Sequence, residues 1–267
     1  MSDSDPPADR DAAAADADGR TVVEERTPSP MRRTIASRLH RSYSEAVHVT
    51  ASREVDAEPL VSAVDYAAER HGVDVSLVDP LLVSVSEALD RHPSFNATFE
   101  EGTHRVYEEH HVGYGVALDA GLVAPVVRDV GSLTLAGLSE RRAALVERVL
   151  AGDYDAGDLR GGTFTVSNLG PLGVDSFTPI INPPQVAILG VNRLRERAVP
   201  AGDLGAGGGT TDAASAGQGD PVDFRRKLRL DLSFDHRVVD GAQAARFLAT
   251  LADRIESRAP DETDAAE

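Results

Sequence analysis

The sequence predicts an α+β fold in which a mixed β-sheet is flanked by helices. Strand-like and helix-like segments follow one another without strict alternation, which favours α+β over a doubly wound sheet. The core must be aliphatic, because the 267 residues include no Trp and only seven Phe. Apolar residues still make up 41% of the chain, enough to fill the interior of one large domain.

The first half of the chain predicts three helices and several short strands. A basic helix with apolar residues at helical spacing begins at Met31, and an alternating strand follows it. Two more helices precede two short strands and then a third, whose Pro125 is typical of a sheet edge or a bulge. The expected ranges are 31–46, 58–71 and 79–91 for the helices and 48–56, 104–118 and 121–127 for the strands.

The second half predicts longer strands between two helices. A helix over 134–152 ends at Gly152, a residue type common just past a helix end. A strand that runs into a glycine turn comes next, then a continuous apolar strand typical of one covered on both faces, then a long alternating strand. The expected ranges are 161–170, 185–194 and 223–237 for these strands and 240–258 for the closing helix.

These elements predict one domain, over residues 28–258, between two disordered tails. The first tail, residues 1–27, is rich in Ala, Asp and Pro and strongly acidic, and the second covers 259–267. Inside the domain, residues 200–220 are rich in Gly, Ala, Asp and Ser and predict a flexible surface loop.

The charge of the chain argues against several classes of partner. Its 44 acidic and 27 basic residues give a net charge of −17, and acidic surfaces repel nucleic acid and anionic membranes. No apolar run reaches the ~18–20 residues of a membrane span, and the N-terminus does not resemble a signal peptide, so we expect a cytoplasmic protein. The only Lys is Lys227, against 26 Arg. This composition favours a halophilic protein, although a genome rich in G and C would also favour Arg and Ala.

The residue types present limit the possible chemistry. The chain has no Cys, which excludes thiolate catalysis, disulfides and Cys-ligated zinc. In DLSFDHRVVDG (231–241) a strand ends at His236, and an unperturbed histidine, with its pKa of ~6.5, accepts a proton near neutral pH. Asp240 lies where a helix N-cap would sit. Taken alone, the motif favours a surface or core histidine for His236 and only a cap for Asp240.

The stretch SFDHRVVDGAQAARFL closely resembles the closing motif of the dihydrolipoamide acyltransferases of 2-oxo acid dehydrogenase complexes. Other motifs follow in that family's order, so the resemblance covers about residues 28–258. These motifs are MRRTIASRL, HVTASREVD, LDRHPSFNATF, VGYGVALDAGLVAPVVRD and GGTFTVSNLGPLGVDSFTPIINPPQVAILGV. The resemblance implies a fold like that of chloramphenicol acetyltransferase, assembled as a homotrimer or a larger symmetric assembly.

The resemblance also implies an activity, the transfer of an acyl group between dihydrolipoamide and coenzyme A. A thiol with a pKa of ~8.5 is mostly protonated at neutral pH and needs a base to become a good nucleophile. His236 matches the family histidine that would take this proton, and Ser167 matches the serine that would stabilise the oxyanion. Asp240 matches the family aspartate, which we expect to fix local geometry through an Arg. A hydrolase triad and a metal site are not expected, because neither a GxSxG elbow nor a third metal ligand is found.

Coenzyme A is implied as a substrate, with no covalently bound cofactor. Asp119, Asn168, Gly190 and Asn192 fall where family members face coenzyme A. Asp119 and Asn168 could hydrogen-bond its polar arm, and Gly190 would let the backbone approach it. Turn formation for Asp119 and tight sheet packing for Gly190 are equal alternatives.

The sequence also departs from full-length family members, which carry lipoyl and subunit-binding domains. Neither domain is recognisable here, and Lys227 lies inside a predicted strand, so we expect a separate lipoyl-carrying protein to supply the lipoyl group. A 2-oxo acid decarboxylase and dihydrolipoamide dehydrogenase are the further partners implied. A stand-alone coenzyme A-dependent acetyltransferase with a small-molecule acceptor and a non-catalytic scaffold subunit stay open as alternatives. The sequence does not specify the acyl group.

Overall fold

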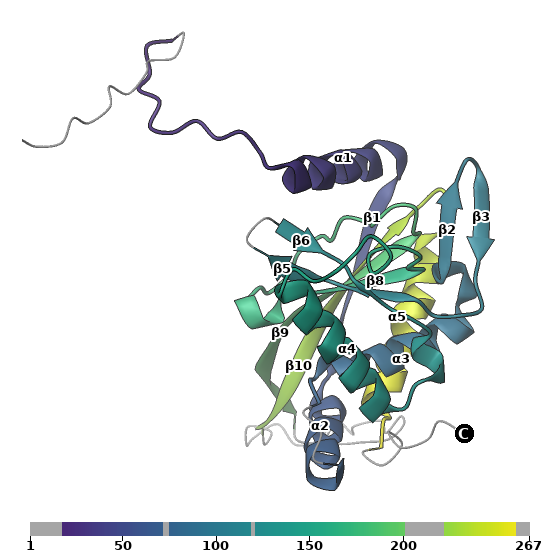
Figure 1. Ribbon diagram of the computed structural model, residues 1–267. Helices are drawn as coiled ribbons and strands as arrows, with labels where there is room; N and C mark the ends of the chain where they lie inside the picture. Colours follow the sequence, from purple (N-terminus) through teal and green to yellow (C-terminus); the bar gives the residue numbers. More distant parts are fainter. Residues whose placement is uncertain (1–17, 72–74, 119–120, 201–221, 260–267) are drawn as a thin grey trace, which may run out of the picture.

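A six-stranded mixed sheet forms the centre of the molecule (Figure 1). The computed structural model describes residues 18–71, 75–118, 121–200 and 222–259. The strand order is β1-β10-β9-β8-β4-β7, with parallel pairing only between β9 and β8 and between β8 and β4. The strands are β1 (His48–Asp56), β4 (Val112–Tyr114), β7 (Val126–Val127), β8 (Phe164–Asn168), β9 (Ala187–Pro200) and β10 (Val222–Asp235). This mixed sheet confirms the predicted α+β fold.

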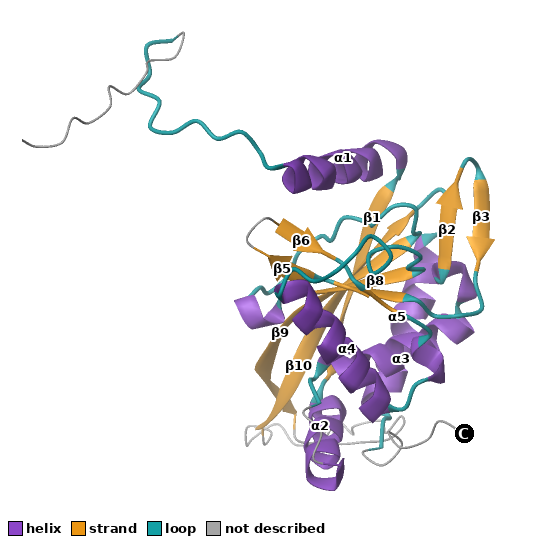
Figure 2. Cartoon of the chain, viewed as in Figure 1, coloured by secondary structure: helices purple, strands orange, loops and turns teal. Residues whose placement is uncertain are grey.

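The described residues form five α-helices, and their bounds agree with the predicted ranges to within two residues (Figure 2). They are α1 (Pro30–Glu45), α2 (Glu58–His71), α3 (Val78–Arg91), α4 (Leu135–Leu150) and α5 (Gly241–Glu256). The core lies between the sheet and α2 to α5, with α3 and α5 contributing most. At its centre the Phe247 ring packs against Phe95 and Phe164, with ring centroids 4.8 and 5.9 Å apart. The rest of this core is mostly aliphatic, as the composition predicts.

Alternation along β10 gives the sheet two different faces. Leu228, Leu230 and Leu232 are buried against the helices. The residues between them, such as Arg229 and Asp231, point to the opposite side, because successive side chains of a strand alternate. We call this side the outer face of the sheet. By register it carries Ser52 of β1, Asp231 of β10, Gly190 of β9 and Ser167 of β8.

Most residues of helix α1 are exposed. The Ser29 hydroxyl accepts a hydrogen bond from the Arg32 amide at 3.2 Å and Pro30 opens the helix, a favourable N-terminal pair. Ser42 is its one buried residue, and its hydroxyl donates to the Ile181 carbonyl at 2.6 Å. Its first turns contact the domain through Met31, which packs beside Tyr154, and Figure 1 shows the helix apart from the other helices.

The short strands differ from the prediction. The expected strand pair over 104–118 is divided among β3 (Thr103–Val106), β4 and β5 (Val116–Leu118), because the Asn96 amide binds the carbonyls of Tyr107 and Glu109 and interrupts strand pairing there. The third strand is broken at Pro125 into β6 (Gly121–Val123) and β7, which lies at the sheet edge. Strand β2 (Ala97–Glu100) pairs with β3, and β5 pairs with β6, in two small separate sheets.

Other predicted segments are only partly described. The loop over 200–220 and most of both tails lie outside the described residues. Residues 22–29 have no regular secondary structure and are almost all exposed. Within the described ranges, none of the helices has the length and apolar character needed to cross a membrane.

Candidate active site

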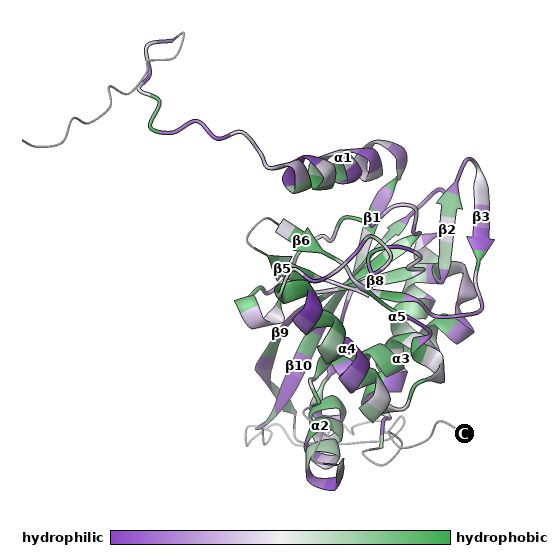
Figure 3. Cartoon of the chain, in the orientation of Figure 1, coloured by the Kyte–Doolittle hydropathy of each residue, from purple (hydrophilic) through white to green (hydrophobic). Residues whose placement is uncertain are grey.

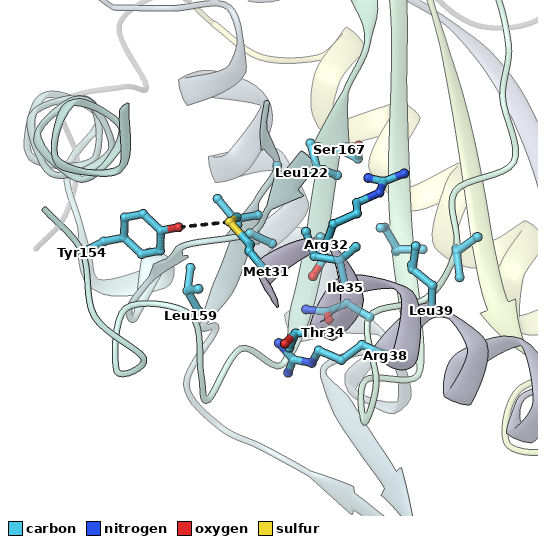
Figure 4. Close-up of a pocket in the computed structure, with 17 residues that line it drawn as sticks. Met31, Arg32, Thr34, Ile35, Arg38, Leu39, Leu122, Tyr154, Leu159 and Ser167 are labelled. Atoms are coloured by element: carbon cyan, nitrogen blue, oxygen red, sulfur yellow. Dashed lines mark hydrogen bonds between the residues drawn. The ribbon is translucent and has the colours of Figure 1, made fainter. Parts of the chain in front are cut away.

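A cavity of about 400 Å³ opens on the outer face, between α1 and strand β8 (Figure 4). Its wall on the α1 side includes Met31 and Ile35, and the Tyr154 hydroxyl points at the Met31 sulfur, 3.9 Å away. Most of the lining is apolar, so a ligand seated there loses much of its water. The lining residues are Met31, Arg32, Thr34, Ile35, Arg38, Leu39, Gly115, Leu122, Val123, Ala124, Tyr154, Leu159, Thr165, Ser167, Ile180, Asn182 and Ile188.

Ser167 lies near the end of β8 and is 5% exposed. Its hydroxyl lies against Gly115, where an added Cβ would be 3.4 Å from Oγ. The neighbouring Thr165 hydroxyl lines the same cavity and donates to Gln185 Oε1 at 2.6 Å. The Ser167 hydroxyl, in contrast, has no hydrogen-bond partner in the described parts of the chain. Because Ser167 lines the cavity, this hydroxyl is free to donate a hydrogen bond to a bound molecule.

His236 is the first residue after β10 and is exposed. Its backbone amide donates to the Val47 carbonyl at 2.8 Å, and its ring lies 6.0 Å from the Phe234 ring. The imidazole thus projects from a fixed backbone position at the end of the sheet, as predicted for a residue held by a strand end.

The structure places His236 and Ser167 apart. Ser167 is aligned with Gly190, and Gly190 with Asp231, whereas His236 lies five residues further along β10. Two strand spacings of ~4.8 Å and five residues of ~3.3 Å put the two Cα atoms on the order of 19 Å apart. His236 is also absent from the residues that line the Ser167 cavity. One copy of the chain therefore cannot bring the imidazole to the Ser167 hydroxyl.

Asp235, which the sequence reasoning missed, fixes the backbone before His236. It is almost fully buried and accepts hydrogen bonds from the Arg237 guanidinium at 2.6 Å and from the Val47 amide at 3.2 Å. Burial opposes ionisation of Asp235, but the hydrogen bonds from Arg237 and Val47 outweigh it, so the pKa of this carboxyl is lowered. The Arg237 guanidinium also lies 4.9 Å from the Phe99 ring centroid. In the sequence, the Asp-His-Arg triplet at 235–237 is the feature that could have predicted this ion pair.

Asp240 caps helix α5. Its carboxylate accepts from the Gln243 amide at 2.7 Å, and the Gln243 side chain accepts from the Asp240 amide at 2.8 Å, a reciprocal capping box. The expected cap is therefore present. The expected Arg partner is not found among the described residues, and the neighbouring Arg237 binds Asp235 instead.

The residues predicted to face coenzyme A have structural partners. The Asn192 amide donates to Asp231 at 2.7 Å and to the Arg229 carbonyl at 3.0 Å. Gly190 lies under the Phe177 ring, only 2.9 Å from where a Cβ would be, so tight packing explains this glycine. Asn168 accepts from the Gly170 amide at 2.9 Å, a turn contact. Asp119 lies outside the described residues.

Asp231 is a second residue that the sequence reasoning missed. It is fully buried on the outer face, where it accepts hydrogen bonds from Ser52 at 2.5 Å, Ser176 at 3.2 Å and the Phe177 amide at 3.1 Å. Asn192 and Arg229 also donate to it. Burial raises the pKa of Asp231, but these hydrogen bonds outweigh burial and the pKa is lowered overall. This carboxylate therefore ties the segment around Ser176 to the sheet.

Comparisons with known proteins agree with this architecture. The catalytic-domain model of the 2-oxoacid dehydrogenases acyltransferases matches residues 22–262. The chain is 34% identical over 237 residues to the dihydrolipoyllysine-residue acetyltransferase component of the pyruvate dehydrogenase complex of Mycobacterium bovis, covering 86% of this chain and 41% of that relative. It is also 34% identical over 240 residues to the succinyltransferase component of the 2-oxoglutarate dehydrogenase complex of Rickettsia bellii, covering 88% and 56%. The chain thus spans about two fifths to just over half of these relatives.

Solved structures extend the likeness to three dimensions. The cubic core of a pyruvate dehydrogenase multienzyme complex superposes with a TM-score of 0.80 at 31% identity, covering 91% of this chain and 96% of that one. The Azotobacter vinelandii dihydrolipoamide acetyltransferase, studied for a serine, a histidine and an asparagine in its catalytic mechanism, gives a TM-score of 0.78 at 31% identity, covering 89% and 93%. From the cavity, the fold and these matches together, the chain belongs to the 2-oxoacid dehydrogenase acyltransferase family and corresponds to its catalytic domain.

Proposed function

We propose that this chain is an acyltransferase that moves an acyl group between coenzyme A and dihydrolipoamide on a separate lipoyl protein. The observation that carries the proposal is the Ser167 hydroxyl, which lies in a largely apolar cavity without a hydrogen-bond partner among the described residues. Membership of the family supports it, because the relatives are named as acetyl- and succinyltransferases of lipoyl-lysine residues.

In this mechanism His236 is the general base. It takes the proton of the acceptor thiol, and the thiolate attacks the carbonyl carbon of the acyl thioester. The Ser167 hydroxyl donates a hydrogen bond to the oxyanion that forms, at the position where negative charge develops. When the tetrahedral intermediate collapses, the carbon–sulfur bond to the donor breaks and the leaving thiolate takes the proton back from the His236 imidazolium.

Asp240 acts as a positioning residue in this proposal. The asparagine studied in the Azotobacter enzyme follows its histidine by four positions, as Asp240 follows His236. An amide does not exchange protons as a base, yet it caps a helix as well as a carboxylate does. We therefore assign Asp240 to the start of α5 and the turn after His236, and no step of the chemistry passes through its carboxylate.

We place the complete site between two copies of the chain, with His236 from one copy and Ser167 from its neighbour. The estimated 19 Å between the two Cα atoms within one copy and the exposure of His236 support this arrangement. A homotrimer or a larger symmetric assembly provides such an interface at every copy. Asn168, Gly190 and Asn192 would hold the sheet beside coenzyme A, and Asp119 would contact its polar arm.

A test of the activity is acyl transfer from acetyl- or branched-chain acyl-coenzyme A to free dihydrolipoamide. We expect turnover by the wild type and a large loss in His236→Ala. Turnover with only a non-lipoyl acceptor would favour a stand-alone acetyltransferase, and no turnover in either protein would favour a scaffold.

A mixing experiment tests the shared site. His236→Ala and Ser167→Ala are each expected to lose most of their activity, but co-assembled from equal amounts they restore a complete pair at about a quarter of the interfaces. Recovery of activity in the mixture, with a trimer or larger assembly measured by native mass spectrometry, would support the shared site. A mixture as inactive as its components would contradict it.

We also propose a halophilic, cytoplasmic protein that works with a 2-oxo acid decarboxylase and a dihydrolipoamide dehydrogenase. The net charge of −17 with a single Lys supports the salt requirement, since salt screens the repulsion among carboxylates. The chain should unfold at higher temperature in molar KCl than in dilute buffer, as measured by circular dichroism. Cell fractionation and co-purification test the location and the partners.

A further inference from the structure

A fully buried carboxylate lies on the outer face, at Asp231 of β10. Figure 3 shows the hydrophilic ends of β9 and β10, whereas Asp231 lies beyond them, among the last six residues of β10, all of which are buried. Burying a charge costs free energy unless hydrogen bonds compensate for it. Buried ion pairs often stabilise a protein no more than apolar residues would. The groups that this carboxylate holds in place therefore say more about its role than its stability does.

The two oxygens of Asp231 bind different parts of the molecule. Oδ1 accepts hydrogen bonds from the Ser52 hydroxyl of β1 at 2.5 Å and from the Arg229 guanidinium at 3.0 Å. Oδ2 accepts from the Ser176 hydroxyl at 3.2 Å and from the Phe177 backbone amide at 3.1 Å. Oδ1 thus faces the neighbouring strand, and Oδ2 also reaches a segment that crosses the outer face.

This segment covers residues 175–182 and has no regular secondary structure. We call it the strap. Its Phe177 ring lies against Gly190, 2.9 Å from where a Cβ would be. At its other end, the Ile181 carbonyl accepts a hydrogen bond from the Ser42 hydroxyl of α1 at 2.6 Å. Because the strap belongs to no strand ladder, hydrogen bonds to side chains such as these determine its position.

The strap forms part of the wall of the Ser167 cavity. Ile180 and Asn182 line that cavity, and both lie within five residues of Phe177. Gly190, which the Phe177 ring covers, is aligned with Ser167 on the neighbouring parallel strand, about 4.8 Å away. A shift of the strap would therefore change the space beside the Ser167 hydroxyl.

We propose that Asp231 is a positioning residue that sets acyl-group selectivity by holding the strap as a wall of the Ser167 cavity. This rests on the proposed function, in which the oxygen of the acyl thioester carbonyl lies at the Ser167 hydroxyl. The acyl chain continues from the same carbon into the apolar cavity, so a fixed wall there limits its size. One methylene more or less in an apolar pocket typically changes kcat/KM ~10- to 200-fold.

Two serines that bind opposite oxygens of Asp231 give a matched pair of variants. Ser176→Ala removes a hydrogen bond on the strap side, and Ser52→Ala removes one on the side of β1. The measurement is kcat/KM for acetyl-, isovaleryl- and hexanoyl-coenzyme A with dihydrolipoamide as the acceptor. We expect the ratio of hexanoyl to acetyl transfer to rise ~2- to 10-fold in Ser176→Ala, the range that one hydrogen bond can supply. The ratio should keep its wild-type value in Ser52→Ala.

Two substitutions test the carboxylate itself. Asp231→Ala removes every hydrogen bond from the strap to this position and should raise the ratio ~10- to 100-fold. Asp231→Asn keeps one oxygen for the strap, while its NH₂ group takes the place of Oδ1, where the Ser52 hydroxyl can accept and the partly exposed Arg229 can turn to solvent. This variant should keep the wild-type ratio. Hydrogen exchange measured by mass spectrometry should be faster over 175–182 in Asp231→Ala and unchanged in Asp231→Asn.

The selectivity ratio distinguishes positioning from a general loss of structure. In Asp231→Ala, an equal fall in kcat/KM for all donors with an unchanged ratio would give the carboxylate a purely structural role and overturn the proposal. Equal changes of the ratio in Ser176→Ala and Ser52→Ala would also overturn it, and this pair still decides if Asp231→Ala does not fold.

The exchange measurement separates this proposal from the proposed function. If the wild type transfers none of the donors, the proposed function fails and the selectivity fails with it. Exchange over the strap then still tests whether Asp231 holds it. Faster exchange in Asp231→Ala than in Asp231→Asn supports that part of the proposal, and equal exchange in the two variants overturns it.

Discussion

The two faces of the central sheet carry opposite kinds of side chain although the same strands form both. On the helix side, Leu228, Leu230 and Leu232 of β10 are buried in the core. On the outer face, the intervening Arg229 and Asp231 belong to ion pairs and hydrogen bonds. The Ser167 cavity lies on the outer face. We infer that the helix side supplies most of the stability and that the outer face carries the proposed site, and substitutions should separate the two.

The largest effect is expected on the helix side. Phe247→Ala removes the ring that packs against Phe95 and Phe164 and leaves a cavity, so the free energy of unfolding should fall by ~3–5 kcal/mol. Urea denaturation measures it. Phe224→Ala, at a phenylalanine of β10 that is 65% exposed, is the matched control and should stay within ~0.5 kcal/mol. Equal losses in the two variants would show that burial of the Phe247 ring in the core does not set the cost.

On the outer face, Ser167→Ala should lower kcat ~100- to 1000-fold, because one oxyanion donor is lost. The unfolding temperature should not change, since no hydrogen bond among the described residues is broken. Thr165→Val, in the same cavity, is the control, and it should have the reverse pattern of effects. It breaks the bond to Gln185 and should cost ~1 kcal/mol of stability with little loss of rate. A kcat within tenfold of wild type in Ser167→Ala would remove Ser167 from the mechanism.

A smaller effect is expected at the start of α5, in the turn that follows His236. Asp240→Ala removes the cap on the Gln243 amide and should lower the free energy of unfolding by ~1 kcal/mol. Asp240→Asn keeps a side-chain oxygen for the cap and should preserve both stability and rate. A rate loss in Asp240→Asn with unchanged stability would instead give the carboxylate charge a role in the chemistry.

More of the helix side than of the outer face could be predicted from the sequence. Local sequence patterns located the five described helices, and β10 was predicted as one long alternating strand. The Asp231 network depends on register, because Ser52 and Ser176 are 179 and 55 positions away from it along the chain. The Ser167 cavity likewise needs α1 to lie over β8, which no local pattern specifies. His236, Ser167 and Asp240 came from recognisable motifs, whereas Asp231 and Asp235 became visible only through their partners.

The smallest expected effect is a pH dependence of stability from His110, on the helix side. Its ring is buried and hydrogen-bonded to the Ser86 hydroxyl at 2.6 Å, and burial lowers the pKa of His110, although Asp90 and Asp129 oppose the shift. The folded chain then binds fewer protons than the unfolded chain below about pH 6.5, so stability is present above that pH and is lost as the pH falls.

Between about pH 7.5 and pH 6 the His110 contribution is bounded at about 0.8 kcal/mol by protonation of an ordinary histidine in the unfolded chain. Urea denaturation of wild type and His110→Gln across this range measures it. His92, whose pKa burial also lowers, is present in both proteins and cancels in the difference. A wild type that loses no more stability on acidification than His110→Gln would show that the buried ring accepts its proton without cost, and that the helix side of the sheet tolerates charge at this position.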